Sequence, residues 1–320
     1  MTCTSGASAA ASRAAAPRRS RPLRRSRRQM LLWPYRPLRP LYNSKYNINH
    51  QFADPSSSEN NLESAATIIL IRDVSNVAEV FMIKRATKSN FGGAWVFPGG
   101  KVDNDDLKHN ILDYCQGLDD KEASSILSLN EGGLSYWVAC IRECFEECGV
   151  LLAYRENGHL FKPSLDETII LNDLRRQLNN GSLVFIEILK KLNLRLAVDR
   201  ILYLSHWVTP KIESRRYSTR FFITSIPNDQ ETMHDGYEAV DSLWIKIEKA
   251  LNDYKRGTFP IIMPTIKNLE AIAGYPSTLS ILEDKESILP SDILTIEPKF
   301  FFEEGKLVGL LPGDAGYEDH

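Results

Sequence analysis

Three glutamates stand close together in the segment Arg142–Val150, which reads RECFEECGV. At 100° per residue, Glu143, Glu146 and Glu147 share an arc about 100° wide on one side of a helix. Like charges at these spacings repel by about a few tenths of a kcal/mol per pair. A divalent cation such as Mg²⁺ or Mn²⁺ reverses that repulsion, and it also binds phosphate oxygens and activates water. The alternative is a solvated acidic face neutralised by Arg142, and the pattern alone favours this alternative.

The other side of the same helix is apolar. Its apolar residues fall within an arc about 120° wide: Leu134, Trp137, Val138, Ile141, Cys144, Phe145 and Cys148. The pattern predicts a helix from about Ser135 to Cys148 that packs on a core and ends at Gly149. Cys140, Cys144 and Cys148 suggest a soft-metal or redox site as an alternative. Since Cys144 and Cys148 lie in the apolar arc, core packing is the favoured interpretation.

Strand and helix patterns alternate along the rest of the chain. Ala66–Arg72 and Glu79–Lys84 indicate two strands of a hairpin. The four glycines of Asn90–Gly100 permit backbone conformations closed to other residues. Helices are expected at Glu122–Leu129, Asp166–Asn179, Ser182–Leu192, Ile247–Tyr254 and Pro264–Ala273, and strands at Ile201–Val208, Arg220–Ser225 and Ser242–Ile245. Without any internal repeat, this alternation predicts one α/β domain with insertions.

Charge is distributed unevenly between the first 53 residues and the rest. Residues 1–53 hold ten Arg and one Lys but no Asp or Glu, and the remaining residues carry a net charge of −13. The Arg-, Ala- and Ser-rich stretch is typical of a mitochondrial transit peptide. The alternative is a basic tail that contacts nucleic acid or anionic lipid, and prolines in the stretch oppose a long amphipathic helix. We expect residues 1–60 to be a disordered leader or transit peptide and linker.

Composition also limits the other classes of protein. No apolar run approaches the roughly 18 residues that a membrane span needs. The five cysteines are not spaced as a disulfide framework, so a reducing compartment is the simpler assumption. The acidic balance after residue 53 argues against a nucleic-acid partner, which favours a basic surface.

The acidic helix resembles a known motif. Arg142–Val150 matches the second half of the Nudix box, R-E-(apolar)-x-E-E-x-G-(apolar), and Phe97–Gly100 (FPGG) matches the loop that enters the box. Asp106 stands where the family normally has Glu. Between Asp106 and Arg142 lie 35 residues, far more than in an ordinary box, so the resemblance implies an insertion at about residues 107–134.

The insertion and several further segments resemble the acyl-coenzyme A diphosphatases of the nucleoside-diphosphate-linked moiety X type 19 group. The similarity covers about residues 64–317, and the segments that carry it are Ala94–Lys101, His206–Pro210, Arg216–Phe222, Leu243–Trp244, Met263–Thr265 and Leu310–Tyr317. The resemblance implies a Nudix-type α/β/α sandwich around a mixed sheet, over residues 61–320. It also implies a helical insertion at about residues 160–195 and a C-terminal extension at about 276–320.

Roles for individual residues follow from the resemblance. Glu146 and Glu147 would bind Mg²⁺ or Mn²⁺, and Glu143 would be a further ligand or the general base. A main-chain carbonyl of Gly99 or Gly100 would complete the ligand set, and Arg142 would pair with the glutamates and hold them in position. A further acidic residue often acts from a later loop in this family. Glu238 is the candidate for it, with a solvent-exposed loop acid as the alternative.

The implied reaction is hydrolysis of CoA or acyl-CoA to 3′,5′-ADP and (acyl-)phosphopantetheine. Candidate phosphate-binding cations are Lys84, Arg85, Arg215, Arg216 and Arg220, with surface charge as the alternative for each. Ser89 stands where the CoA signature of related enzymes has Arg, so that part of the CoA pattern is missing. Three tryptophans, Trp95, Trp207 and Trp244, are candidates for stacking on adenine or for structural anchoring.

Two other functions remain open. One is Nudix hydrolysis of another diphosphate, such as a dinucleotide, a nucleotide sugar or capped RNA. The other is a Nudix nucleotide-binding module without catalysis, which only Asp106 supports. Mitochondrial localisation is expected from the leader, with a peroxisomal or cytoplasmic location as the alternatives. The last residues, Tyr317–His320, are not a peroxisomal tripeptide, and oligomeric state is not indicated.

Overall fold

The long strand β1 (Leu62–Val74) is the strand on which the central sheet is built. The structure is a computed structural model that describes residues 62–88, 91–227, 230–236, 238–303 and 306–319. The leader expected over residues 1–60 lies outside this described part. Within the described residues, no helix combines the length and apolar character that a bilayer crossing requires.

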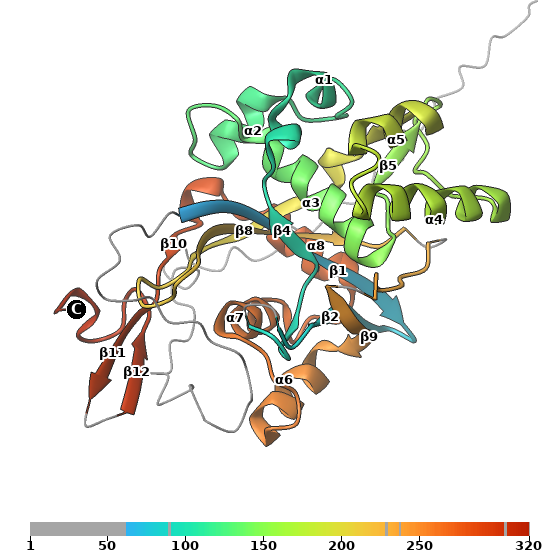
Figure 1. Cartoon of the computed structure of the whole chain (residues 1–320). Helices are drawn as coiled ribbons and strands as arrows, with labels where there is room; N and C mark the ends of the chain where they lie inside the picture. Colours follow the sequence, from blue (N-terminus) through green and yellow to red (C-terminus); the bar gives the residue numbers. More distant parts are fainter. Residues whose placement is uncertain (1–61, 89–90, 228–229, 237, 304–305, 320) are drawn as a thin grey trace, which may run out of the picture. The chain divides into compact units, whose positions relative to one another are not determined.

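The two halves of β1 pair with different partners along one edge. Its first half pairs antiparallel with β4 (Gly99–Lys101), and its second half pairs antiparallel with β2 (Val77–Arg85). Along its other edge, β8 (Arg216–Ser225) runs parallel to β1 over ten residue pairs. Strands β4 and β2 therefore occupy the same edge of β1 at different points along its length (Figure 1).

The remaining strands extend the sheet or form small separate pairs. The main path is β10-β7-β8-β1-β2-β3, with β9 paired to β2. The bounds are β3 (Trp95–Val96), β7 (Leu202–Val208), β9 (Ala239–Lys246) and β10 (Thr295–Ile296), with β5 (Ala153–Arg155) paired to β6 (Leu194–Leu196) and β11 (Lys299–Glu303) paired to β12 (Lys306–Leu310). The C-terminal extension thus contributes one strand, β10, to the central sheet.

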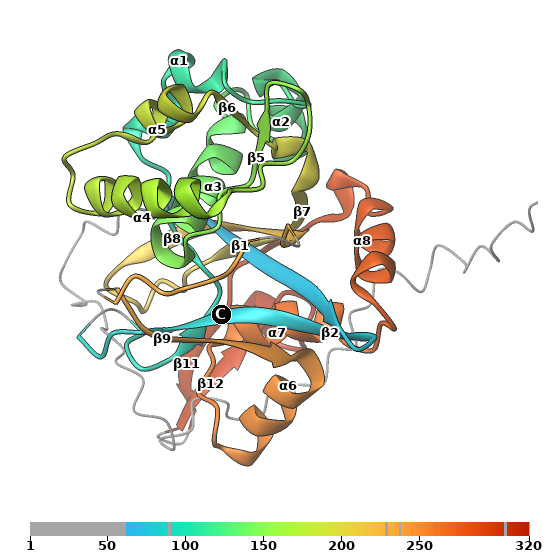
Figure 2. The ribbon, with the colours of Figure 1, turned by 90° about the vertical axis from the view of Figure 1, so that its right-hand side faces the viewer.

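Helices cover both faces of this sheet. Figure 2 shows α1 to α5 on one side and α6 and α7 on the other, with α8 beside β7 and β8. The bounds are α1 (His109–Leu112), α2 (Asp120–Ile126), α3 (Leu134–Cys148), α4 (Leu165–Asn179), α5 (Phe185–Leu192), α6 (Ile247–Arg256), α7 (Met263–Ile272) and α8 (Thr278–Glu286), with 3₁₀ turns at Asn104–Leu107, Val198–Arg200, Pro290–Asp292 and Tyr317–Asp319. The fold is the α/β arrangement with helices around a mixed sheet that the sequence predicts.

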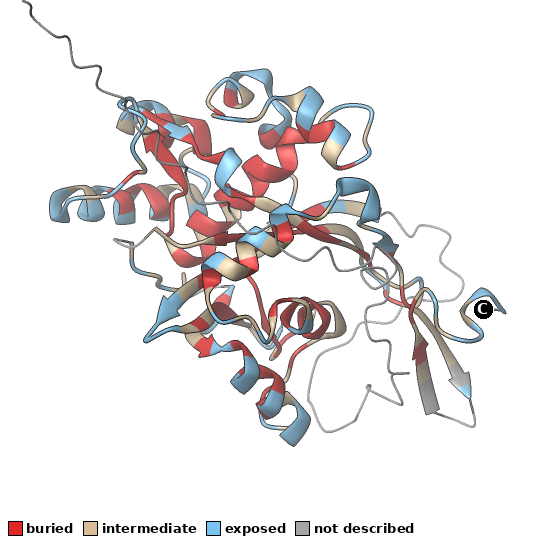
Figure 3. Ribbon diagram, turned by 180° about the vertical axis from the view of Figure 1, so that it is seen from behind, coloured by how far each residue is buried: buried red, intermediate tan, exposed pale blue. Residues whose placement is uncertain are grey.

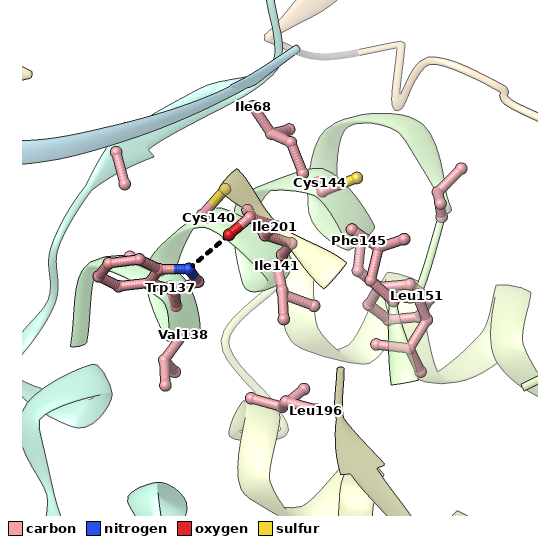
Figure 4. Close-up of a cluster of buried hydrophobic side chains, with 14 of the residues drawn as sticks. Ile68, Trp137, Val138, Cys140, Ile141, Cys144, Phe145, Leu151, Leu196 and Ile201 are labelled. Carbon is pink, nitrogen blue, oxygen red and sulfur yellow. Dashed lines mark hydrogen bonds between the residues drawn. The ribbon is translucent and has the colours of Figure 1, made fainter. Parts of the chain in front are cut away.

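Helix α3 is buried along nearly its whole length (Figure 3). Its apolar side packs against Ile68 and Leu70 of β1, and Trp137 Nε1 donates a hydrogen bond to the main-chain oxygen of Ile201 at 3.0 Å (Figure 4). Cys140 and Cys144 lie fully buried in this core. The interpretation of these cysteines as packing residues is confirmed.

The segment before α3 supplies its N-terminal cap. Asp120 of α2 accepts hydrogen bonds from the main-chain nitrogens of Gly132 at 3.0 Å and Leu134 at 2.9 Å. A Cβ at Gly133 would overlap the backbone of Ser124, so α2 and α3 are in backbone contact there. At the other end, Gly149 adopts a left-handed φ of 76° and terminates α3.

The expected elements are confirmed wherever a long pattern marked them. The strands around residues 66–84 and 201–245, and the helices around residues 135–192 and 247–273, lie within a few residues of their expected bounds. Helices α1 and α8 and the short strands β3 to β6 and β10 to β12 were not expected. These strands are too short to show an alternation of apolar and polar residues. Helix α8 begins after the Ser277 cap, but its apolar residues do not follow a clear helical spacing.

We expect the stability of the fold to depend on pH through His206, which lies at the junction of β7, β8 and β10. Its ring bonds Thr295 at 2.8 Å and Ser218 at 2.7 Å, and burial, aided by the Arg220 charge, lowers its pKa from 6.5 to about 4. Between these two pH values the unfolded chain gains a proton that the folded chain does not. Stability is therefore lost as pH falls through this window. We expect His206→Gln to lessen the drop in unfolding free energy between pH 7 and pH 5 by about 1 kcal/mol, measured by urea unfolding. An equal drop in both proteins would contradict this expectation.

Candidate active site

The acidic side of α3 faces a cavity of about 1250 Å³. Glu143, Glu146 and Glu147 all line it, yet none is a solvated surface acid. The exposed fractions of the Glu143 and Glu146 side chains are 13% and 22%, and Glu147 is 4% exposed. Burial of three neighbouring carboxylates has a large desolvation cost unless they meet positive charge. The alternative of a solvated acidic face is therefore excluded.

Arg142 is the buried cation that meets these carboxylates. Its Nη1 donates to Glu143 Oε1 at 2.8 Å and to Glu146 Oε2 at 3.2 Å. Burial lowers the pKa of Arg142, but the hydrogen bonds and charges of its carboxylate partners outweigh burial and raise it. The guanidinium is therefore a fixed positive charge that orients two of the three glutamates.

Asp106 holds this arginine from its opposite edge. Its two carboxylate oxygens accept from Arg142 Nε at 2.9 Å and Nη2 at 2.8 Å, and its side chain is 1% exposed. Nη2 also donates to the main-chain oxygen of Lys101 at 2.8 Å. Asp106 thus orients Arg142, which is the role that the sequence left open. Asp106 was the only residue that supported a binding module without catalysis, so that hypothesis loses its support.

The Gly99–Gly100 loop approaches the carboxylates without side chains. The main-chain nitrogen of Gly99 donates to Glu147 Oε2 at 2.7 Å. A Cβ at Gly100 would overlap the Glu143 carboxylate, and a Cβ at Gly99 would stand 2.5 Å from the main-chain oxygen of Ala66. A side chain is therefore excluded at Gly99 by backbone, and at Gly100 it would displace the Glu143 carboxylate.

Crowding and burial make the glutamates hard to ionise together. Burial, with the charges of Glu146 and Glu238, raises the pKa of Glu143 to about 8, although Arg142 opposes the shift. Burial and the Glu143 charge also raise the pKa of Glu147. A site of this kind favours a ligand that brings positive charge to the carboxylates.

Comparison with known proteins assigns this arrangement to a family. The model of the NUDT19 Nudix domain matches residues 62–272, which include the glycine loop and all of α3. The chain belongs to this family. It is a Nudix hydrolase, an enzyme that cleaves diphosphate bonds. The predicted resemblance to this group is confirmed.

Individual relatives agree with the family. Acyl-coenzyme A diphosphatase NUDT19 of Xenopus laevis is 28% identical over 275 residues, with 75% of this chain and 72% of the relative covered. Putative nudix hydrolase 7 of Caenorhabditis elegans is 25% identical over 260 residues, with 80% and 75% covered. The crystal structure of the NUDIX hydrolase from Alicyclobacillus acidocaldarius is 23% identical, has a TM-score of 0.56, and covers 71% of this chain and 97% of its own. The last likeness supports the fold.

Nudix hydrolases generally depend on divalent metal ions, and the donor types of this site suit one. Carboxylate and carbonyl oxygens are the ligands that Mg²⁺ and Mn²⁺ prefer, and the raised pKa values of Glu143 and Glu147 show carboxylates in need of positive charge. The described side chains do not form a ready-made cluster of three metal-binding groups. The donor atoms of these residues therefore suit a divalent ion. In this structure the carboxylates of Glu143 and Glu146 accept hydrogen bonds from Arg142, and that of Glu147 accepts one from Gly99.

Glu238 reaches the same cavity from the loop before β9. It lines the cavity as an exposed residue, and its negative charge contributes to the raised pKa values of Glu143 and Glu147. Among the tryptophans singled out from sequence, Trp207 lines the cavity. Trp95 stacks on Phe259, and Trp244 packs on Phe81 below Arg72, so these two are structural.

The cations predicted to bind substrate are scattered, and most lie elsewhere. Arg85 lines the cavity, but Lys84 lies over Trp95. Arg216 pairs with Glu297 at 2.7 Å. Arg220 is buried against Tyr136 on the α3 side of β8. Side chains alternate between the faces of a strand, so Arg216 and Arg220 point away from the face that Tyr217 and Thr219 present to the cavity. The structure thus does not bring these two arginines to the cavity wall.

Helix α4 carries a polar stripe that was not predicted from the sequence. Asn172, Arg175, Arg176 and Asn179 all line the cavity and follow the i, i+3, i+4, i+7 spacing of one helix face. A signal was present, because Leu171, Leu174 and Leu178 form the apolar stripe of α4 and Arg175 falls beside it. A charged residue on the buried side of an amphipathic helix is rare without a partner or a function.

Loss of the Asp106 charge should loosen Arg142. We expect Asp106→Asn to lower the unfolding free energy by about 3 kcal/mol, because a buried guanidinium loses its bidentate partner. Turnover should fall by about 10- to 100-fold, as for other residues that orient a metal-binding group. Chemical unfolding and steady-state kinetics measure the two effects. Asp105→Asn is the matched control, because this neighbouring carboxylate is half exposed and pairs with Lys108 at the surface. Equal behaviour of the two variants would disprove the role of Asp106.

Proposed function

We propose that the chain hydrolyses the diphosphate of CoA or of acyl-CoA, with Mg²⁺ or Mn²⁺, to 3′,5′-ADP and (acyl-)phosphopantetheine. The observation that carries the proposal is the position of the carboxylates of α3 in the wall of one large cavity with extensive apolar lining. The printed names of the Xenopus laevis and Gallus gallus relatives, both Acyl-coenzyme A diphosphatase NUDT19, support the same substrate class.

The size and lining of the cavity suit an amphiphilic nucleotide. Its volume of about 1250 Å³ exceeds the roughly 300–1,000 Å³ of most ligand pockets. Apolar side chains from β7, β8, α7 and the C-terminal hairpin contribute to it: Trp207, Phe221, Ile262, Met263, Pro264 and Phe300. A nucleotide diphosphate fits near the charged residues of α3 and α4, and a pantetheine or acyl chain fits the apolar lining.

The residues have distinct roles in this reaction. Glu146 and Glu147, with a main-chain oxygen at Gly99 or Gly100, would hold the metal, and Glu143 or Glu238 would accept a proton from the attacking water. The ion would neutralise phosphate charge and lower the pKa of that water. Arg142, fixed by Asp106, keeps Glu143 and Glu146 in position. Arg85, which lines the same cavity, is a candidate to contact the diphosphate.

A panel of diphosphates tests the substrate. The protein should release 3′,5′-ADP from CoA or its esters in Mg²⁺ or Mn²⁺, with products separated by mass, and EDTA should stop the release. Dephospho-CoA, ADP-ribose, NADH and diadenosine polyphosphates complete the panel. Turnover of another member alone would keep the Nudix chemistry and reject CoA as the substrate.

A carboxylate variant tests the site itself. Glu146→Gln keeps the shape of the side chain but removes a charge from the cluster, and we expect turnover to fall by at least about 100-fold. Glu187→Gln is the matched control and should keep wild-type activity, because Glu187 is a partly exposed glutamate of α5 that pairs with Lys190 outside the cavity lining. Unchanged activity in Glu146→Gln would refute the metal assignment.

We also propose that residues 1–60 direct the chain to mitochondria, because their ten arginines occur without any acid before Asp54. A fusion of these residues to a fluorescent protein should colocalise with a mitochondrial marker. The same fusion with Arg18, Arg19, Arg24 and Arg25 changed to Gln should lose that pattern. A diffuse or peroxisomal pattern for the unaltered fusion would refute the proposal.

A further inference from the structure

We infer that Arg175, on helix α4, is a binding residue for a phosphate group of the substrate. This inference rests on the proposed function, since it takes the cavity beside α3 as the place where a phosphate-bearing substrate binds. It assigns the phosphate contact to the helical insertion, and not to the strand residues Arg216 and Arg220.

Arg175 is a buried cation with hydrogen-bonding capacity to spare. The residue is 6% exposed and lines the cavity. Its Nη2 is buried and has no hydrogen-bond partner among the described residues. A buried guanidinium nitrogen without a partner is costly, so it marks a place where a ligand oxygen would restore a lost bond.

Contacts with helix α3 hold the guanidinium of Arg175 in place. Arg175 Nε donates to the main-chain oxygen of Glu146 at 2.9 Å, and Asn179 Nδ2 donates to the same oxygen at 3.2 Å. Helices α3 and α4 lie side by side (Figure 2). Gly149, which ends α3, lies against the guanidinium, because a Cβ there would stand 3.2 Å from Nη1. The cation therefore lies beside the residue proposed to hold the metal, and it keeps Nη2 for another partner.

Neighbouring groups make a subsite of suitable chemistry. Asn172 and Arg176 come from the same polar stripe of α4, and His234 lines the cavity from the loop before β9 with a buried Nδ1 that has no partner among the described residues. Two unused nitrogens and a preformed arginine suit the several oxygens of a phosphate. The negative charges that act on Arg175 include Asp235 and Glu147, which makes the region mixed in charge and disfavours unselective binding of anions.

Substitution of Arg175 tests the inference. In Arg175→Gln we expect kcat/KM for CoA to fall by about 10- to 100-fold and the dissociation constant of the product 3′,5′-ADP (hereafter ADP) in Mg²⁺, measured by calorimetry, to rise by a similar factor. Arg175→Lys, which keeps the charge but loses the fork of donors, should recover part of both. Lys191→Gln is the matched control, because Lys191 is an exposed cation of α5 outside the cavity lining. Thermal unfolding of all variants shows whether each one folds.

Two ligands distinguish which phosphate is bound. Equal losses with CoA and dephospho-CoA place the diphosphate on Arg175, whereas a loss with CoA alone places the 3′-phosphate there. Either result supports the inference. A folded Arg175→Gln protein with wild-type kcat/KM and ADP affinity would overturn it, even if CoA is the substrate. Absence of ADP and CoA binding in the wild type would overturn it as well.

Failure of the proposed function gives a different pattern. If the wild type cleaves another diphosphate but not CoA, the CoA proposal fails, and the effect of Arg175→Gln on that substrate and on ADP binding still decides the role of Arg175. Weaker ADP binding in Arg175→Gln, with partial recovery in Arg175→Lys, then supports the subsite alone.

Discussion

The ion-pair network around Arg142 is the interaction on which the catalytic end of the molecule depends. Its buried guanidinium forms ion pairs with Asp106 on one edge and with Glu143 and Glu146 on the other. Removal of Asp106 leaves the buried guanidinium without its bidentate partner, and removal of Arg142 leaves the buried carboxylates uncompensated. The network therefore couples two segments far apart in sequence: residues 101–106, which include Lys101 and Asp106, and the acidic side of α3.

The chain between Asp106 and Arg142 fits this constraint. It forms α1 and α2 before it returns as α3 to the same place. Asp120 of α2 caps α3, and Asp106 pairs with Arg142 from the 3₁₀ turn at residues 104–107. Within that turn the Asp103 nitrogen donates to Asp106 Oδ2 at 2.8 Å. The segment between Asp106 and α3 thus contributes to the site by capping and burying the helix.

Local pattern was enough to predict α3, its acidic arc and the strands β1, β2, β7, β8 and β9, because each of these repeats at the period of its own structure. The family match then supplied the roles of the glutamates and of the glycine loop. Two things were not predictable from local pattern. The facing of Arg216 and Arg220 depends on the register of β8 against β1 and β7, and a one-residue shift reverses it. The role of Arg175 depends on the docking of α4 against α3, which joins residues 29 positions apart.

The position of Arg216 and Arg220 away from the cavity and the role of Arg175 have one physical cause. Helix α3 carries three acidic residues, so the cations that bind an anionic substrate must come from other parts of the chain. A cation close to the glutamates forms ion pairs with them, and its donors are then occupied. Arg142 is such a cation, with its donors directed at Asp106, Glu143, Glu146 and a main-chain oxygen. Arg175 is held instead by a neutral carbonyl, that of Glu146, and so retains donor capacity at the cavity wall. A cation fixed by main-chain oxygen is better placed to bind phosphate than one fixed by carboxylates, because its charge is not already neutralised.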